Sequence, residues 1–287
     1  MPKEQVIEII LDSLKDSAIV FVFVFFIHVL LAFFDHNISN FLVKRKQTGP
    51  VFGALFGLVP QCGTSVLGAD LYIRKYISLG TLIAIFLSCS DEAFIALVTS
   101  GTDKAWAILP LIALKFSIGL FIGFICDVIF RKQEIEQVEE VEEEEECEIH
   151  HHENNKFHKY FMHPLMHSLM IFLYVLVICL ALGFLIGFIG EDNFASFMSS
   201  NKYLSPLYAS IIGLIPNCAS SLLITELYVS GHLSFGALLA GLLVNSGLGM
   251  MLLLRKRKTA KYVLLIIGIC FVVAVVSGYI TCLINGF

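Results

Sequence analysis

The sequence predicts an all-α polytopic membrane protein built from two inverted-topology repeats. Two observations lead to this prediction: long apolar stretches recur along the chain, and one short motif is written twice. Hydrophobic residues make up 57% of the 287 residues, above the roughly 45–50% of a soluble domain. The motif reads GLVPQCGTS at 57–65 and GLIPNCASS at 213–221, with its prolines offset by 216 − 60 = 156 positions. Such self-similarity indicates that both halves share one structural unit.

Two apolar stretches of the first half are too short to cross a bilayer. Residues 49–59 and 63–72 flank Pro60, and each reaches only about half of the ~20 residues that a crossing helix needs. Two such arms predict either a re-entrant hairpin or one helix broken in mid-membrane. The other elements expected in this half are an amphipathic lead-in at 3–16 and crossings at 17–34, 78–100 and 106–130.

The positions of Lys and Arg decide between these two paths. Basic clusters at 44–46 and 74–75 flank the two arms, and such clusters concentrate in cytoplasmic loops. The arms therefore enter and leave the membrane on one side, as a re-entrant hairpin. The same rule places 131–132 and 255–258 in the cytoplasm, so the second half runs in the opposite orientation. Its expected elements are crossings at 165–189, 234–254 and 262–284, and a hairpin at 206–228 that enters from outside.

These elements divide the chain into a first repeat at 1–132, a cytoplasmic linker at 133–159 and a second repeat at 160–287. Within the linker, 134–148 contains ten glutamates and no Lys or Arg, and three histidines follow at 150–152. This composition is typical of a solvated, disordered tether; a weak metal-sensing arm is the alternative.

Composition also bounds the partners. Outside the glutamate run, 24 − 10 = 14 acidic residues face 19 basic ones, yet no basic patch is interleaved with aromatic side chains, so nucleic acid is not an expected partner. A phosphate-cradling GxxxxGK[ST] loop is missing from the sequence, which argues against an ATP motor. We expect no cofactor, a multi-pass location in the plasma (inner) membrane and contact with the lipid bilayer, and a homodimer stays open.

The predicted functional site lies where helices break inside the membrane. Non-helical backbone is tolerated there only within protein or beside water, and inverted-repeat transporters bind their substrates at such breaks. Each hairpin breaks at Pro60 or Pro216, and the third segment of each half breaks at 89–92 or 245–247. The residues expected to bind substrate are Gln61, Cys62, Thr64, Ser65, Cys89, Ser90, Asp91, Glu92, Asn217, Cys218, Ser220, Ser221, Asn245 and Ser246.

Carboxylates and thiols at these breaks indicate the chemistry. A carboxylate near the bilayer centre costs at least about 2.5–3.5 kcal/mol, so Asp91 and Glu92 are expected to act as cation ligands or proton carriers. Proton and cation would compete for one group, which is the minimum that an antiporter needs. Thiolates suit soft ions such as zinc, cadmium or arsenite, and carboxylates suit manganese. The candidate metal ligands are Cys62, Cys89, Asp91, Glu92 and Cys218, and for the cysteines buried packing is the alternative.

Other polar and sulfur-containing residues are assigned structural roles. Asp70 and Glu226 occupy equivalent positions near the hairpin exits and are expected to cap a helix or to form a salt bridge. The cysteines show no CxxC pairing, so a disulfide framework is not expected. Four of them are expected to pack as small hydrophobic residues: Cys126, Cys179, Cys270 and Cys282.

Three stretches resemble a known family: the doubled GL(V/I)P(Q/N)C motif, LSCSDEA at 87–93 and LSFGALLAGLL at 233–243. They are similar to the ten-helix heavy-metal exporters, which are arsenic-efflux-like permeases with some relatives labelled as manganese transporters. The resemblance covers nearly the whole chain except the acidic linker. It implies efflux of heavy-metal or metalloid ions across the plasma membrane. Six crossings and four hairpin arms would supply the ten helices.

We therefore expect a secondary-active transporter, not an enzyme, that exports a divalent cation such as Mn, Zn or Cd, or arsenite. The site is expected at mid-membrane, between the two Pro-x-Cys hairpin tips and the Cys-Ser-Asp-Glu break, with Asp91 and Glu92 coupling transport to protons. One alternative is a permease for an organic anion or organoarsenical with no metal ligation. The other is an intramembrane enzyme, although HExxH and GxSxG elements are missing from the sequence.

Overall fold

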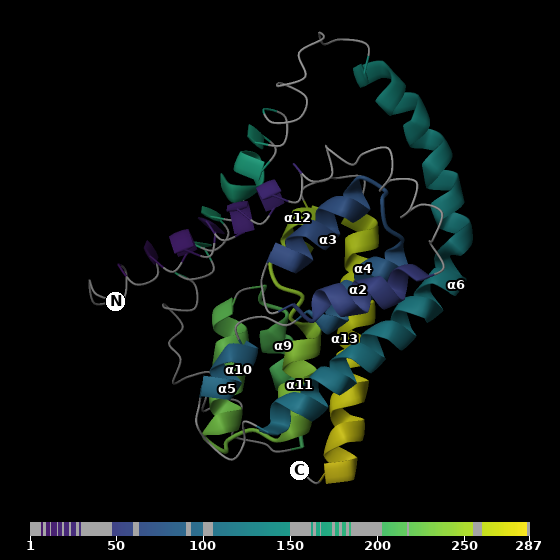
Figure 1. Cartoon of the computed structure of the whole chain (residues 1–287). Helices are drawn as coiled ribbons and strands as arrows, with labels where there is room; N and C mark the ends of the chain where they lie inside the picture. Colours follow the sequence, from purple (N-terminus) through teal and green to yellow (C-terminus); the bar gives the residue numbers. More distant parts are fainter. Residues whose placement is uncertain are drawn as a thin grey trace.

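All regular secondary structure in the described part of the chain is helical (Figure 1). The computed structural model describes residues 48–59, 63–89, 93–99, 106–149, 203–216, 218–254 and 260–285, with scattered positions in 7–29 and 162–184; side chains at 131–149 are not described. The first half contains α2 (Gly49–Gly57), α3 (Gly63–Ile73), α4 (Leu79–Ser88), α5 (Ala93–Thr99) and α6 (Ile108–Ile149). The second contains α9 (Ser205–Gly213), α10 (Cys218–Val229), α11 (Phe235–Val244), α12 (Gly249–Leu254) and α13 (Ala260–Asn285).

Helix boundaries in the second half repeat those of the first. α9 begins 205 − 49 = 156 positions after α2, and α11 begins 235 − 79 = 156 positions after α4. Pro50 and Pro206 stand in the first turns of α2 and α9, where proline is favoured because its missing N–H is not needed. Ser78 and Ser234 are the N-caps of α4 and α11, and each hydroxyl accepts a hydrogen bond from the third backbone N–H after it. The same local signals thus produce the same helices twice.

Glycines let α4 approach α6 closely in the first half, and let α11 approach α13 in the second. A Cβ added at Gly80 of α4 would lie 2.1 Å from the Gly123 oxygen of α6. A Cβ added at Gly236 of α11 would lie 2.5 Å from the Gly278 oxygen of α13. Neither distance leaves room for a side chain, so the two backbones nearly touch at each crossing, as at the small-residue contacts of membrane helices.

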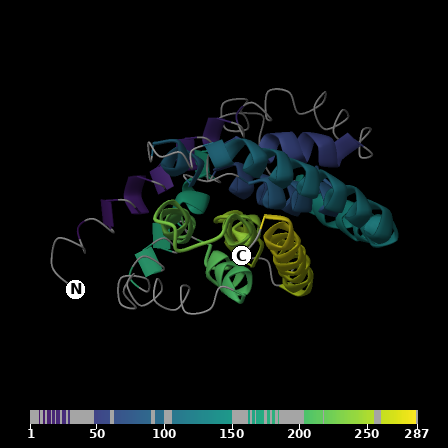
Figure 2. The same cartoon turned by 90° about the horizontal axis from the view of Figure 1, so that it is seen from below.

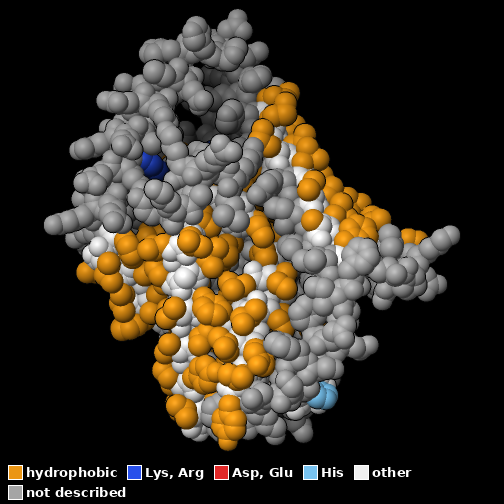
Figure 3. Space-filling view, turned by 180° about the vertical axis from the view of Figure 1, so that it is seen from behind, with side chains coloured by type: hydrophobic (Ala, Val, Ile, Leu, Met, Phe, Trp, Pro, Cys, Tyr) orange, Lys and Arg blue, Asp and Glu red, His pale blue; other side chains and the backbone are white. Residues whose placement is uncertain are grey.

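Among the described residues, three apolar stretches are long enough to cross a bilayer: Ile108–Phe130 in α6, Phe235–Leu253 across α11 and α12, and Val263–Ile284 in α13. Only 22% and 28% of the residues in the α6 and α13 stretches are buried, against 94% in the α11–α12 stretch. α6 and α13 therefore form outer walls, and α11–α12 lies in the centre. The face shown in Figure 3 is covered largely by hydrophobic side chains where it is described, as expected for a surface in contact with lipid.

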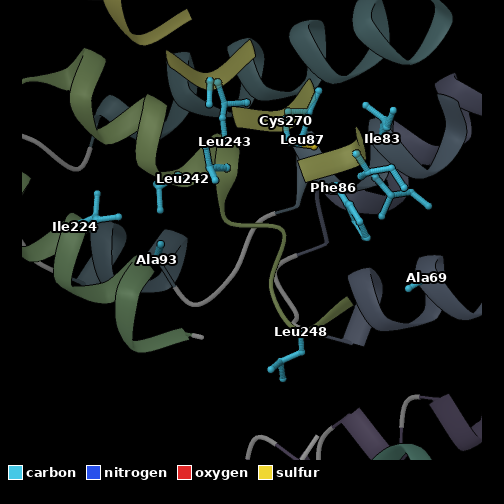
Figure 4. Packing of buried hydrophobic residues seen from close by; sticks show 14 of the residues in the cluster. Ala69, Ile83, Phe86, Leu87, Ala93, Ile224, Leu242, Leu243, Leu248 and Cys270 are labelled. Carbon is cyan, nitrogen blue, oxygen red and sulfur yellow. The ribbon is translucent and has the colours of Figure 1, made fainter. Parts of the chain in front are cut away.

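The two halves pack as two layers around one core. Seen from below, most helices of 49–130 lie in one layer and most of 203–285 in the other (Figure 2). α4 and α11 contact each other between the layers. Phe86 and Leu87 of α4, Leu242 and Leu243 of α11, and Cys270 of α13 belong to this buried cluster (Figure 4).

Near the N-terminus, the described residues between 7 and 29 are helical, in agreement with the predicted lead-in and first crossing. Ser17 donates a hydrogen bond to the Ser13 carbonyl at 2.7 Å, and Phe21 meets Phe172 edge-to-face with ring centroids 5.8 Å apart. The predicted first crossings of the two halves are therefore in contact at this pair of rings.

The prediction of a disordered linker is wrong for its first part. α6 continues without interruption through the glutamate run to Ile149 and extends away from the body (Figure 1). Glutamate is a good helix former, and the membrane part of α6 supplies the nucleus, so each added residue needs only the favourable propagation step. Residues 150–159 lie outside the described part.

Candidate functional site

The third segment of each half is interrupted, which confirms the sequence prediction. α4 ends at Ser88, and Cys89 after it has a non-helical ψ of 126°; residues 90–92 lie outside the described part, and α5 begins at Ala93. Residues 245–248 separate α11 from α12. At the second break the Asn245 Oδ1 accepts a hydrogen bond from the Gly247 N–H at 3.0 Å, and Gly247 adopts a left-handed φ of 61°. Asn and Gly favour such a local turn over helix continuation, so these residue types account for the break.

The hairpin arms are also separate helices. α2 ends at Gly57 before α3 begins at Gly63, and α9 ends at Gly213 before α10 begins. Pro216 follows α9 and is buried, whereas Pro60 lies outside the described residues. The prediction that 49–72 is not one continuous helix is confirmed, and the re-entrant path stays a prediction.

The second arm of each hairpin is α3 in the first half and α10 in the second. The first turn of each second arm contacts the helix break in the third segment of the same half. Thr64 Oγ1 in α3 lies 4.0 Å from the Cys89 thiol, and Asn245 Nδ2 donates to the Ser220 hydroxyl of α10 at 3.2 Å. Ser220 follows Thr64, and Asn245 follows Cys89, by the same 156 positions. One polar contact is thus made twice, with a thiol in one half and an amide in the other.

The second arms also reach across to the opposite half. α3 packs against α12, and α10 packs against α5 (Figure 1); Figure 4 shows Ala93 of α5 beside Ile224 of α10. In the first of these contacts the Gly249 N–H donates to the Ser65 hydroxyl at 3.4 Å, and a Cβ at Gly249 would lie only 2.2 Å from the Ser65 carbonyl oxygen. The residues around the two breaks are therefore brought together by contacts between both halves of the chain.

Lys115 is the central residue that sequence reasoning missed. It lies on α6, is 2% exposed, and its ammonium donates to the carbonyls of Cys89 at 2.5 Å and Leu242 at 2.7 Å. The Phe94 ring centroid lies 6.0 Å from Nζ, at the limit of a cation–π contact. A signal was present, because Lys115 is the sole basic residue in 106–130 and intramembrane charges are rarely incidental.

Asp127, the other charged residue of the apolar α6 stretch, has a structural role. Its Oδ1 accepts a hydrogen bond from the Gly80 N–H at 2.8 Å, one of the N–H groups in the first turn of α4 that lack a partner within the helix. A carboxylate at a helix N-terminus is also stabilised by the helix dipole. Asp127 therefore fastens α6 to the start of α4, away from the break at its other end.

Seven of the predicted site residues lie in the described part, and all are buried: Thr64, Ser65, Cys89, Ser220, Ser221, Asn245 and Ser246. The hydroxyl of Ser246 has no hydrogen-bond partner in that part of the chain. The remaining candidates lie outside it: Gln61, Cys62, Ser90, Asp91, Glu92, Asn217 and the side chain of Cys218. Among described residues no group of three or more His, Cys, Asp or Glu comes together, so the metal-ligand set stays a prediction.

Two structural assignments from the sequence are confirmed. Asp70 in the last turn of α3 pairs with Arg74, which directly follows the helix, with Arg74 Nε and Asp70 Oδ2 2.9 Å apart. Cys126, Cys270 and Cys282 are free and buried, as packing cysteines should be; Cys179 lies outside the described residues. Glu226 is exposed on α10, so the repeat-related carboxylates of the two halves have different surroundings.

Comparison with known proteins identifies the family. Residues 4–192 and 174–286 match a family described as "Putative, 10TM heavy-metal exporter". The chain belongs to this family. It is therefore a multi-pass membrane protein of the heavy-metal exporter family, in agreement with the three apolar spans in the described part of the chain. No curated protein and no solved structure gives a match.

Proposed function

We propose that this member of the heavy-metal exporter family is a secondary-active transporter that binds its cargo where the two interrupted helices meet. The observation that supports this site is that buried hydroxyl, amide and thiol groups lie at both helix breaks inside an apolar core. Buried polar groups are costly in such an environment unless they are paired or functional. Three of the seven described site residues come from the first half of the chain and four from the second, as expected of a site that opens to either side.

We further propose that the two halves have inverted topology, with Pro60 and Pro216 at hairpin tips that approach each other from opposite faces. The recurrent helix boundaries support a repeat, and the loop charges support the inversion. On this arrangement the acidic extension of α6 lies in the cytoplasm of a protein in the plasma membrane. The cargo site then lies at mid-membrane, the usual place in transporters of this design.

The cargo proposed for this site is a soft metal ion or a trivalent metalloid. Its ligands would be the thiols of Cys62, Cys89 and Cys218, with Asp91 and Glu92 as oxygen donors or proton carriers. The Thr64 hydroxyl beside the Cys89 sulfur supports a polar environment for that thiol. Soft thiolates favour zinc, cadmium and arsenite over manganese.

A sensitivity panel in a host that lacks its own exporters tests this proposal. Cys62→Ser and Cys218→Ser should each reduce resistance to cadmium and arsenite, with manganese tolerance little changed, because only the soft ions depend on sulfur. Cys126→Ser and Cys282→Ser are matched controls, since both thiols are buried but lie away from the breaks. Equal loss of resistance for soft and hard ions would indicate a packing role and would contradict thiol ligation.

Coupling is tested at Asp91. If proton and cation compete for this carboxylate, apparent cargo affinity should weaken as pH falls, and binding should release protons. Asp91→Asn keeps the shape without the charge and should abolish this pH dependence in a transport assay with purified protein in vesicles. Fully pH-coupled transport by Asp91→Asn and by Glu92→Gln alike would eliminate proton antiport.

A permease for an organic anion is the second candidate, and the positive ends of two half-helices favour it. The N-terminal ends of α3 and α10 would attract an anion. Asp91→Ala separates the two candidates, because it should cripple cation export and spare anion export.

A further inference from the structure

The ammonium of Lys115 lies between the C-terminal ends of two half-helices. One acceptor is the Cys89 carbonyl, directly after α4 ends, and the other is the Leu242 carbonyl in the last turn of α11. The last four carbonyls of a helix have no partner within it, and they carry the negative end of the helix dipole. Two such ends, one from each half, are thus directed at one point in the buried core.

Two convergent carbonyls from broken helices are the chemistry of a monovalent-cation site. In transporters with discontinuous helices, freed carbonyls and half-helix C-terminal ends coordinate the coupling cation. Two carbonyl oxygens that accept hydrogen bonds from one ammonium are placed to serve as two of the ligands of a desolvated alkali ion. A side chain that supplies its own ammonium needs no such ion.

We propose that the Cys89 and Leu242 carbonyls form a monovalent-cation site that the Lys115 ammonium fills permanently. The cation that joins the two broken helices is then covalently part of the chain. Neither Na⁺ nor K⁺ binds there in the native protein, and neither is needed to hold α4 and α11 together. This inference concerns a structural cation and does not depend on the identity of the transported ion.

The repeat supplies an internal comparison. Gly278 of α13 follows Gly123 of α6 by 155 positions at the equivalent helix crossing, and the same offset from Lys115 leads to Cys270. Cys270 is fully buried but carries no ammonium. The cation is therefore present at one of two equivalent positions, and truncation at Cys270 removes buried volume without removing a charge.

The test is thermal melting of purified full-length variants in detergent, with choline chloride as the reference salt. Lys115→Ala should melt several degrees below the native protein in choline, and methylammonium, Na⁺ or K⁺ should restore its melting temperature in a saturable manner, because ligands that bind only the folded state stabilise it. The native protein and Cys270→Ala should show no such response. Choline is too bulky to enter the space left by the side chain.

Two outcomes would overturn the proposal: a Lys115→Ala melting temperature that is indifferent to all small cations, or the same cation response in Cys270→Ala. If Lys115→Ala does not fold, Lys115→Met and Lys115→Arg replace it. The first keeps the length without the charge and should respond to small cations, and the second keeps the charge and should not; identical behaviour of the two would refute the idea. Because no transport is measured, failure here is distinct from failure of the proposed export activity.

Discussion

Replacing Gly249 with alanine is the most direct test of how the two halves are joined. The new Cβ would lie 2.2 Å from the Ser65 carbonyl oxygen and 2.4 Å from its carbon, whereas ordinary contact begins at 3.4 Å. α12 must therefore move away from α3 by 3.4 − 2.2 = 1.2 Å. Because both obstructing atoms are backbone, no side-chain rotation relieves the clash, and the hydrogen bond from Gly249 to Ser65, already 3.4 Å long, is lost.

Overpacking of this kind costs about 1–3 kcal/mol, which corresponds to a fall in melting temperature of roughly 2–12 °C for a chain of this size. Melting in detergent measures it, with Gly268→Ala as the matched control. Gly268 also lies in a long apolar helix, but a Cβ added there would have nothing within 4 Å, so its replacement should be neutral or gain up to about 1 kcal/mol of helix propensity.

A second variant identifies the source of the effect. Ser65→Ala removes only the hydroxyl, so it should cost less than Gly249→Ala, and it should not rescue Gly249→Ala because the obstructing carbonyl remains. A melting temperature of Gly249→Ala equal to that of the native protein would refute the reasoning, since it would mean that α3 and α12 are not held at the distance described. Rescue by Ser65→Ala would equally contradict the assignment of the clash to the backbone.

Two further predictions follow from single residues. Ser246→Ala removes a buried hydroxyl that has no partner in the described part of the chain, so the variant should be about 1–3 kcal/mol more stable to unfolding while its export falls; a less stable variant with normal export would show that the hydroxyl is structural. Gly231→Ala should lower stability by about 1–2 kcal/mol, because Gly231 follows α10 at a φ of 86°, and unchanged melting would mean that this turn adopts another conformation.

The sequence was sufficient to predict where helices begin and break. Proline, glycine and asparagine act through their own backbone preferences, so the motif at 57–65 and its copy at 213–221 locate the arms without any knowledge of packing. The same applies to the second break, where Asn245 and Gly247 form a turn by themselves. Local signals of this kind are readable because their cause lies within a few residues.

Two features could not be predicted in this way: the packing of α3 and α10 against helices of the opposite half, and the role of Lys115. Contact between α3 and α12 depends on Ser65 and Gly249, which are 184 positions apart. Gly249 is needed there because it has no side chain, not because its backbone conformation requires glycine. The partners of Lys115 are backbone carbonyls, which every residue has and no sequence marks. The linker was predicted wrongly for a related reason, because charge composition describes solvation but does not show that α6 already provides a helix to extend.

The packing of α3 against α12 and of α10 against α5 also sets when, during synthesis, the two halves can be joined. Ser65 leaves the ribosome 184 residues before its partner Gly249, which at about 5–20 residues per second is a delay of roughly 10–40 seconds. Until the second half is made, α3 lacks its contact with α12, and the Lys115 ammonium lacks the Leu242 carbonyl as an acceptor. A chain released before Gly249 is made would therefore lack the contact between α3 and α12 that joins the two halves.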